Sequence, residues 1–247
     1  QGKIYRPIPR DRDFAFFRPG GIMGFFLAYS DSRFEAYNED FTDTYGLSFN
    51  GFKQDRRFYN ELTREDFEAV AREVQQALPD VVIERAVARV PREVRKIEGE
   101  FWARSLKSRR DQLVEFADRL YDLHADVVDV VGSDERELVE AVHQPDGTLE
   151  VTMYSYKGSE RGRELYRRTF SKRDTDEVRL YAFAGRDRVV VRGDGPVRVR
   201  LIGGGGEDEL ESESGNVFAY DTPDGLSISG RARDRRSSDP EVNTYDP

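Results

Sequence analysis

Two segments of this 247-residue chain match each other without gaps, and this repeat constrains the fold more than any other feature. Residues 178–189 read Val-Arg-Leu-Tyr-Ala-Phe-Ala-Gly-Arg-Asp-Arg-Val, and residues 199–210, 21 positions later, read Val-Arg-Leu-Ile-Gly-Gly-Gly-Gly-Glu-Asp-Glu-Leu. Each copy predicts a strand, a glycine corner, an acid and a second strand. A fixed period of this size is typical of a β-solenoid, whose successive turns stack in register. A third turn at residues 217–228 matches only weakly.

The glycine corner at residues 203–210 resembles the G-G-x-G-x-D-x-U-x nonapeptide of calcium-binding β-rolls. The resemblance implies that the glycines expose backbone carbonyls and that the acid supplies carboxylate oxygen. The first copy retains only Gly185 and Asp187 of this pattern. Two interpretations stay open: a calcium corner formed by Gly204, Gly206, Asp208 and Asp187, or a purely structural turn.

The part of the chain before the repeat has a helical pattern. Thr63-Arg64-Glu65-Asp66 resembles a capping box, and apolar residues then recur at helical spacing as far as Pro79. A second, short helix is expected between Asp80 and Pro91, and the longest helix from about Phe101 to Ala125. The aromatic-rich residues 30–60 are predicted to pack against these helices, with a pocket lining as the alternative.

The pattern changes to an alternating one near residues 126–136. A short apolar strand is expected at 127–131, and residues 137–144 and 149–156 flank Pro145-Asp146-Gly147-Thr148, which predicts a hairpin. A further strand is expected at 164–170. The predicted fold class is therefore α+β. A helical lobe at 1–131 is followed by a mostly antiparallel or solenoid-like β domain at 132–230 and by a polar tail or linker at 231–247.

Two acids near the beginning of the sequence are candidates for a metal site. Asp11 and Asp13 follow a strand-like run and are separated by one residue. They point to opposite faces of a regular strand, but can converge on one cation if the strand ends between them. The alternative is that they form salt bridges with Arg10, Arg12 or Arg18.

The run Tyr-Arg-Pro-Ile-Pro-Arg-Asp-Arg-Asp-Phe-Ala-Phe, residues 5–16, resembles the W-x-x-x-P-W-D-x-D-x-x-F-G segment of the CotH-type spore-coat-protein kinases. Residues 106–113 are similar to the Leu…Arg-Arg…Leu helix of that family. The resemblance covers residues 1–125 and implies a helical kinase-like lobe in which Asp11 and Asp13 hold Mg²⁺ with a nucleotide. Two features depart from the family: Phe17-Arg18-Pro19-Gly20 replaces its aromatic-Gly pair, and its nucleotide-binding lobe and catalytic loop have no counterpart here.

Composition excludes several classes of function. A net charge of -9 argues against a nucleic-acid surface, which needs a concentrated basic face. The chain has no cysteine, and no apolar run approaches the ~20 residues that a membrane-spanning helix needs. The basic cluster Lys107, Arg109 and Arg110 is predicted to form ion pairs on a solvated helix face, with phosphate binding as the alternative.

These features predict a piece of a longer bacterial protein of the cell envelope or another extracytoplasmic site, a location inferred from resemblance to envelope and surface-antigen proteins. Its partners would be other domains of the same chain, without nucleic acid and without direct membrane insertion. The first hypothesis is a phosphotransferase-like, metal-binding lobe that has no catalytic activity alone. The alternative is a non-catalytic binding or connecting module with a β-roll corner that calcium stabilises.

Overall fold

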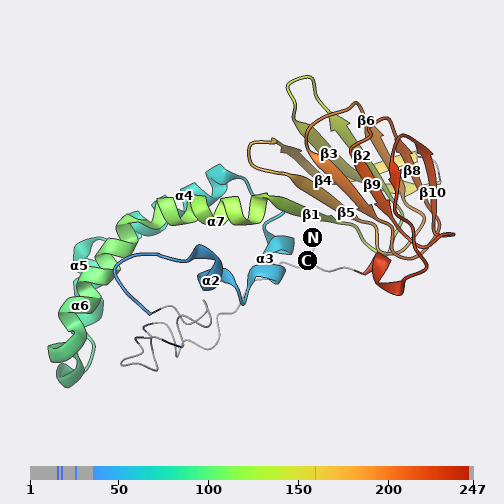
Figure 1. The fold of residues 1–247 in the computed structure, drawn as a ribbon. Coiled ribbons are helices and arrows are strands. Elements are labelled where there is room, and N and C mark those ends of the chain that lie inside the picture. The colour runs from blue at the N-terminus through green and yellow to red at the C-terminus, as the bar shows by residue number, and fades with distance from the viewer. Residues whose placement is uncertain (1–15, 17, 19–25, 27–35, 159, 245–247) are drawn as a thin grey trace. The chain divides into compact units, whose positions relative to one another are not determined.

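The computed structural model describes residues 16, 18, 26, 36–158 and 160–244. The chain divides into two compact units, one formed by residues 1–51 and 64–120 and the other by residues 52–63 and 121–247. Helices precede strands along the chain (Figure 1), which confirms the predicted α+β class. None of the helices in the described ranges is both long and apolar enough to cross a bilayer.

The first unit is helical. The helices in its described part are α2 (Thr44–Ser48), α4 (Arg64–Ala77), α5 (Asp80–Ala88), α6 (Arg92–Asp111) and the first part of α7 (Leu113–Ala125). The helices expected after Thr63 and after Pro79 are found. The single helix expected from Phe101 to Ala125 is wrong in its bounds, because α6 already begins after Pro91 and the helix is interrupted at Gln112. The carbonyl of Pro91 accepts a hydrogen bond from the Arg95 amide (2.9 Å), so Pro91 opens the helix as an N-cap.

The basic cluster on α6 forms ion pairs, as predicted, but mainly with a different helix. The ammonium of Lys107 lies 2.7 Å from Glu84 and the guanidinium of Arg110 lies 2.6 Å from Asp80, both on α5. Arg109 instead lies over the Tyr37 ring, 4.4 Å from its centroid. The basic side chains therefore join α6 to its neighbours in this unit.

Described aromatic residues of the stretch before α4 pack against helices, the interpretation that the sequence favoured. Phe41 stacks on Phe116 of α7 with ring centroids 4.3 Å apart, and Tyr37 meets Phe101 of α6 edge-on at 6.2 Å. Such ring contacts stabilise a helical unit beyond the apolar area that they bury.

The second unit contains two β-sheets (Figure 1). Sheet A has the order β1-β5-β7-β9-β11 and sheet B the order β10-β8-β6-β2-β3-β4. The strands are β1 (Val127–Val131), β2 (Glu137–His143), β3 (Leu149–Lys157), β4 (Glu160–Phe170), β5 (Glu177–Tyr181), β6 (Arg188–Arg192), β7 (Arg198–Ile202), β8 (Asp208–Ser212), β9 (Val217–Tyr220), β10 (Leu226–Gly230) and β11 (Arg233–Asp234).

Parallel pairing dominates these sheets, so the expectation of a mostly antiparallel domain is corrected. Seven of the nine pairings between described strands are parallel, and the antiparallel ones are β2 with β3 and β3 with β4. The predicted hairpin is one of these two. Elsewhere the chain passes from one sheet to the other after each strand, which brings strands of successive turns side by side in the same direction.

The two matching segments lie next to each other in the predicted register, with Val178 opposite Val199 and Leu180 opposite Leu201. The third turn is complete despite its weak sequence match, because β9 pairs with β7 and β10 pairs with β8. The strands β1 and β2 form an earlier turn of the same kind, pairing with β5 and β6. The hairpin formed by β3 and β4 separates this earlier turn from the repeat and hides it in the sequence.

The core of the second unit lies between the two sheets. Alternate residues of most strands point inward and are almost fully buried, as period-two patterning requires, whereas both residues of β11 are exposed. The members include Val130, Leu180 and Leu201 from sheet A and Ala141, Val189 and Leu210 from sheet B. The opposite face of sheet A carries polar positions such as Glu177 and Arg200, whereas that of sheet B includes a small buried cluster formed by Leu138, Tyr154, Tyr156 and Val190.

Residues 231–244 differ from the expected polar tail. They contain β11 and a 3-10 helix (Pro240–Asn243), and β11 pairs with β9 at the edge of sheet A. The side-chain amide of Asn243 donates to the carbonyl of Gly204 (2.8 Å). A short, polar segment can therefore be ordered by backbone pairing, without an apolar pattern in its sequence.

Helix α3 (Phe52–Phe58) belongs to the second unit and lies beside β1, the other edge of sheet A. Arg56 donates to the carbonyl of Val127 (2.9 Å), and Asn60 donates to that of Asp129 (3.0 Å). These side chains donate hydrogen bonds to backbone carbonyls of β1. In the described sheet, no further strand pairs with this edge of β1.

Candidate functional site

The first predicted metal site, Asp11 and Asp13, lies outside the described residues. Within the ranges that are described, no group of three or more Asp, Glu or His side chains is arranged to hold a metal ion. The metal and nucleotide expectations for the helical lobe therefore stay predictions.

The second predicted site, the glycine corner, brings its acids together in a buried column. Glu137, Asp187 and Asp208 each follow a corner on adjacent turns, and each is less than 5 % exposed. The Oδ1 atom of Asp187 accepts the backbone N–H of Glu137 (2.6 Å), and that of Asp208 accepts the N–H of Asp187 (2.8 Å). One oxygen of each aspartate thus ties its own turn to the preceding one.

Three other carboxylate oxygens at the corners, including one from Asp221 on the next turn, have no hydrogen-bond partner among the described residues. These are the Oδ2 atoms of Asp187, Asp208 and Asp221, all in side chains that are almost completely buried. Burial raises the pKa of Asp187 to about 8 and that of Asp208 to about 7, and neighbouring acids add to the rise. In the absence of a bound cation, Asp187 and Asp208 therefore keep their protons to a higher pH than exposed aspartates do.

The glycines of the corner are required by close backbone approach. Gly204 and Gly206 have φ values of +90° and +123°, and a Cβ on Gly206 would overlap the carbonyl oxygen of Gly185. The first copy adopts the same backbone conformation, with Phe183 at φ +64° and Gly185 at φ +122°. The corner conformation is thus repeated even where the sequence departs from the glycine pattern, which supports a structural role for the turn.

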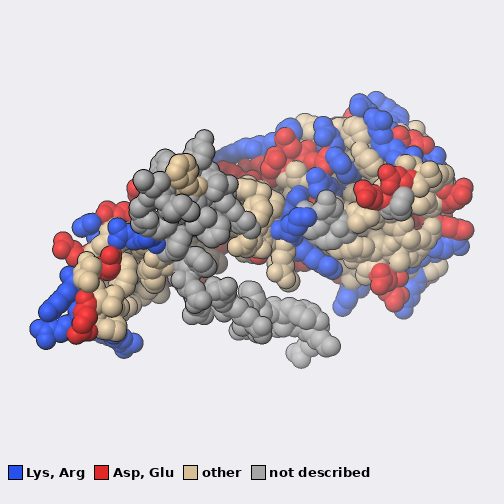
Figure 2. Space-filling view, turned by 60° about the horizontal axis from the view of Figure 1, so that its bottom comes forward, with Lys and Arg blue, Asp and Glu red and all other residues tan. Residues whose placement is uncertain are grey.

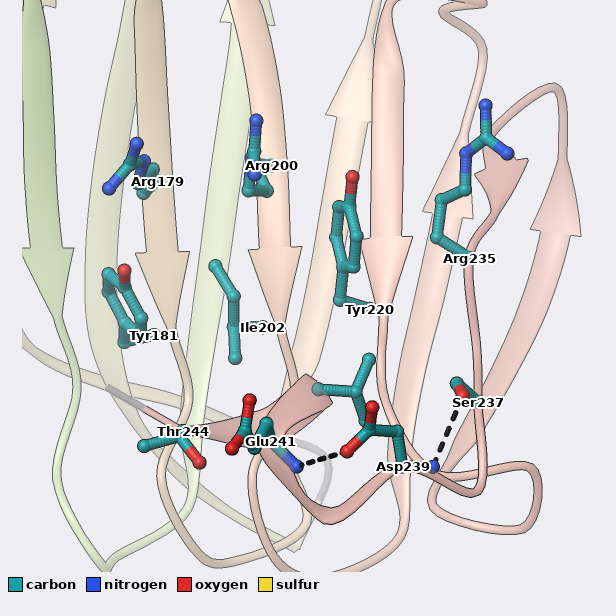
Figure 3. Close-up of a pocket in the computed structure, with 11 residues that line it drawn as sticks. Arg179, Tyr181, Arg200, Ile202, Tyr220, Arg235, Ser237, Asp239, Glu241 and Thr244 are labelled. Carbon is teal, nitrogen blue, oxygen red and sulfur yellow. Dashed lines mark hydrogen bonds between the residues drawn. The ribbon is translucent and has the colours of Figure 1, made fainter. Parts of the chain in front are cut away.

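A pocket that the sequence interpretation missed lies on the outer face of sheet A (Figure 3). Its volume is about 550 Å³, and Arg179, Tyr181, Arg200, Ile202, Tyr220 and Arg235 are among the residues that line it. The repeat contained the pattern that predicts this arginine-lined face. Arg179 and Arg200 stand between core residues in the two copies, so alternation places both on the outer face and pairing places them side by side.

The arginines of this face share few carboxylates. Glu177, almost fully buried, accepts hydrogen bonds from Arg179 (2.9 Å), Arg200 (2.9 Å) and Arg198 (3.3 Å). Burial opposes ionisation of Glu177, but the hydrogen bonds from Arg179 and Arg200 outweigh it and lower the pKa of the carboxyl. The buried carboxylate of Glu177 thus holds one end of the arginine row in place, and the buried Asp129 of β1 lies opposite Arg179 at the same end.

Comparisons of the chain with models of protein families, with curated proteins and with solved structures gave no match. The relationship to spore-coat-protein kinases therefore stays a prediction. The expectation that the chain does not bind nucleic acid also stays a prediction. Acidic and basic side chains are interspersed on the face shown in Figure 2.

Proposed function

We propose that residues 121–244 form a β-solenoid that acts as a non-catalytic binding or connecting module of a larger protein. The observation that carries this proposal is the register of residues 178–181 beside residues 199–202, with the acids that follow them joined along one column. Each turn adds one strand to each sheet, so the module grows by stacking and presents long, regular outer faces. A structure of this kind is suited to separating or presenting other domains.

The hydrogen bonds of the corner support a module that is held together without a metal. Both Oδ1 atoms of Asp187 and Asp208 are taken by backbone N–H groups, and the carbonyl of Gly204 is taken by Asn243. In a calcium-stabilised corner, several oxygen atoms would have to point toward one ion. The candidates are the Oδ1 atoms and the carbonyl just named, or the three Oδ2 atoms that have no partner among the described residues. The kinase-like alternative depends on Asp11 and Asp13, for which the described residues offer no geometry.

Calorimetric titration of the chain with Ca²⁺ and with Mg²⁺-ATP tests the proposal. We expect no binding heat from either. Calcium binding that disappears in Asp208→Asn would instead establish the calcium corner. ATP turnover that is lost in Asp13→Asn would show that the chain is catalytic and would overturn the proposal.

A further inference from the structure

The pocket on sheet A is built by the same stacking that forms the core. Strands β5, β7 and β9 lie side by side and present alternate residues outward at matching positions. Arg179 is beside Arg200, and Tyr181, Ile202 and Tyr220 follow one another along the next row. Figure 3 shows both rows on one face of the sheet.

The arginine row has more positive charge than the neighbouring acids neutralise. Arg179 and Arg200 are directly opposite each other, an arrangement that costs stability unless an anion lies close. They share Glu177 with Arg198, and the buried Asp129 of β1 lies opposite Arg179 in the register. The buried Nε of Arg200 has no acceptor among the described residues. Arg235, which lines the pocket just after β11, has no carboxylate within ion-pair distance in the part of the chain described. These donors suit a carboxylate or a phosphate.

The opposite end of the pocket is acidic. The segment 237–244 closes this end, and Figure 3 shows Asp239 and Glu241 below the arginines and tyrosines. The segment is held by its own hydrogen bonds, since Asp239 accepts the Glu241 amide (3.0 Å) and donates its amide to Ser237 (3.1 Å). Carboxylates at this end favour hydroxyl or other hydrogen-bond donors on a ligand.

The middle of the pocket is aromatic and aliphatic. Tyr181 and Ile202 form a floor that is almost entirely buried, and Tyr220 lies beside them with the Arg200 guanidinium 5.1 Å from its ring centroid. The apolar face of a ring can pack on such a surface. The volume of about 550 Å³ falls within the range of small-molecule sites, which is roughly 300–1,000 Å³.

We infer that this pocket binds a small acidic sugar, oriented with its carboxylate or phosphate on Arg200 and Arg235 and its hydroxyl groups toward Asp239 and Glu241. The ring lies against Tyr181, Ile202 and Tyr220. The site adds a ligand to the connecting module proposed above and uses none of the residues of the acidic column.

Isothermal titration calorimetry on the whole chain tests this inference with glucuronate, glucose 6-phosphate, glucose and inorganic phosphate as probes. At least one of the two acidic sugars is expected to bind. Glucose lacks the anion and phosphate lacks the ring, so both are expected to bind at least tenfold more weakly than that sugar. Comparing glucuronate with glucose 6-phosphate identifies which anion the arginines prefer.

Two neighbouring arginines provide a matched pair of variants. Arg235 lines the pocket and Arg233 does not, although both guanidiniums lie near the Phe218 ring, at 6.0 and 5.0 Å. Arg235→Ala is expected to weaken binding at least tenfold, and Arg233→Ala less than twofold. Glu241→Gln is expected to weaken binding of the acidic sugar and to leave the weak binding of phosphate unchanged. It removes charge only from the end of the pocket that faces the hydroxyl groups of the sugar.

Unchanged thermal midpoints would show that these surface variants are folded. The inference is overturned if neither acidic sugar binds, if phosphate or glucose binds as tightly as the tighter acidic sugar, or if Arg233→Ala and Arg235→Ala weaken binding equally.

Discussion

Asp208 combines two properties that conflict at neutral pH. Its Oδ1 atom accepts the amide of Asp187, which favours the charged form, whereas its Oδ2 atom is buried without a partner. Burial is the larger effect and raises its pKa to about 7, so the folded chain keeps a proton that the unfolded chain releases near pH 4. The resulting stability is full below the ordinary pKa and is lost as the pH rises toward 7.

Asp208→Asn should therefore stabilise the chain relative to the native sequence, and by clearly more at pH 8 than at pH 5, since the cost of the raised pKa grows until the pH passes about 7. The asparagine keeps the Oδ1 acceptor and carries no charge. Each unit of raised pKa corresponds to about 1.4 kcal/mol, so a gain on the order of 1–4 kcal/mol is expected in urea unfolding at pH 8. Asp224→Asn, at an exposed position of the next corner, is the control. An equal effect at both pH values would contradict the buried-acid explanation.

Gly206→Ala should destabilise the chain much more than Gly158→Ala. Both glycines have positive φ, +123° and +62°, but only the Cβ at position 206 would overlap another backbone atom, the carbonyl oxygen of Gly185. Strain alone predicts a loss of about 1 kcal/mol at position 158, and steric overlap adds ~2 kcal/mol or more at position 206. Denaturant unfolding of the two variants separates these effects, and similar losses would disprove the close packing of the corners.

At the scale of single elements, the edge of sheet A depends on α3. Asp129 of β1 is completely buried, and its carboxylate lies 3.6 Å from the guanidinium of Arg56, which also donates to the carbonyl of Val127. Burial raises the pKa of Asp129, and the charges of Arg56 and Arg179 oppose this rise. The helix thus supplies both a charge and a hydrogen bond to an otherwise uncovered edge strand.

Arg56→Ala should cost about 3 kcal/mol, because it leaves a buried carboxylate without its nearest cation. The double variant Arg56→Ala/Asp129→Asn should recover part of this loss, since the uncompensated charge is removed as well. Thermal unfolding of the single and double variants measures this coupling. No recovery in the double variant would mean that Arg56 acts only through its hydrogen bond to the strand.

Helices and strands were predicted correctly where nearby residues specify them and were missed where they depend on distant contacts or lack an apolar pattern. The turn Pro145-Asp146-Gly147-Thr148 specifies a hairpin, and β2 and β3 pair around it. The beginning of α6 was missed because residues 92–100 are strongly charged, so the apolar spacing that marks a helix is weak there. Likewise, β11 is a two-residue strand with no pattern of its own, and only the edge of β9 gives it a partner.

At the scale of the whole molecule, the two units have different kinds of stability. The first consists of helices joined by ion pairs and ring contacts, and the second has an almost fully buried core between two sheets. We therefore expect two transitions in differential scanning calorimetry. Gly206→Ala should lower the midpoint of only one of them. A single transition that moves as a whole would show that the units unfold together.

The sequence by itself determined the order of helices before strands, the hairpin and the register of the two matching segments. The first depends on local periodicity, the second on turn residues, and the third on a repeat that aligns without gaps. Tertiary structure alone decided that the sheets are mainly parallel and that β1 and β2 form a further turn, since the inserted hairpin separates them from the repeat. It also decided how residues from 179 to 244 enclose one pocket. Such contacts join residues far apart in the chain, and no local pattern records which distant strand a given strand will meet.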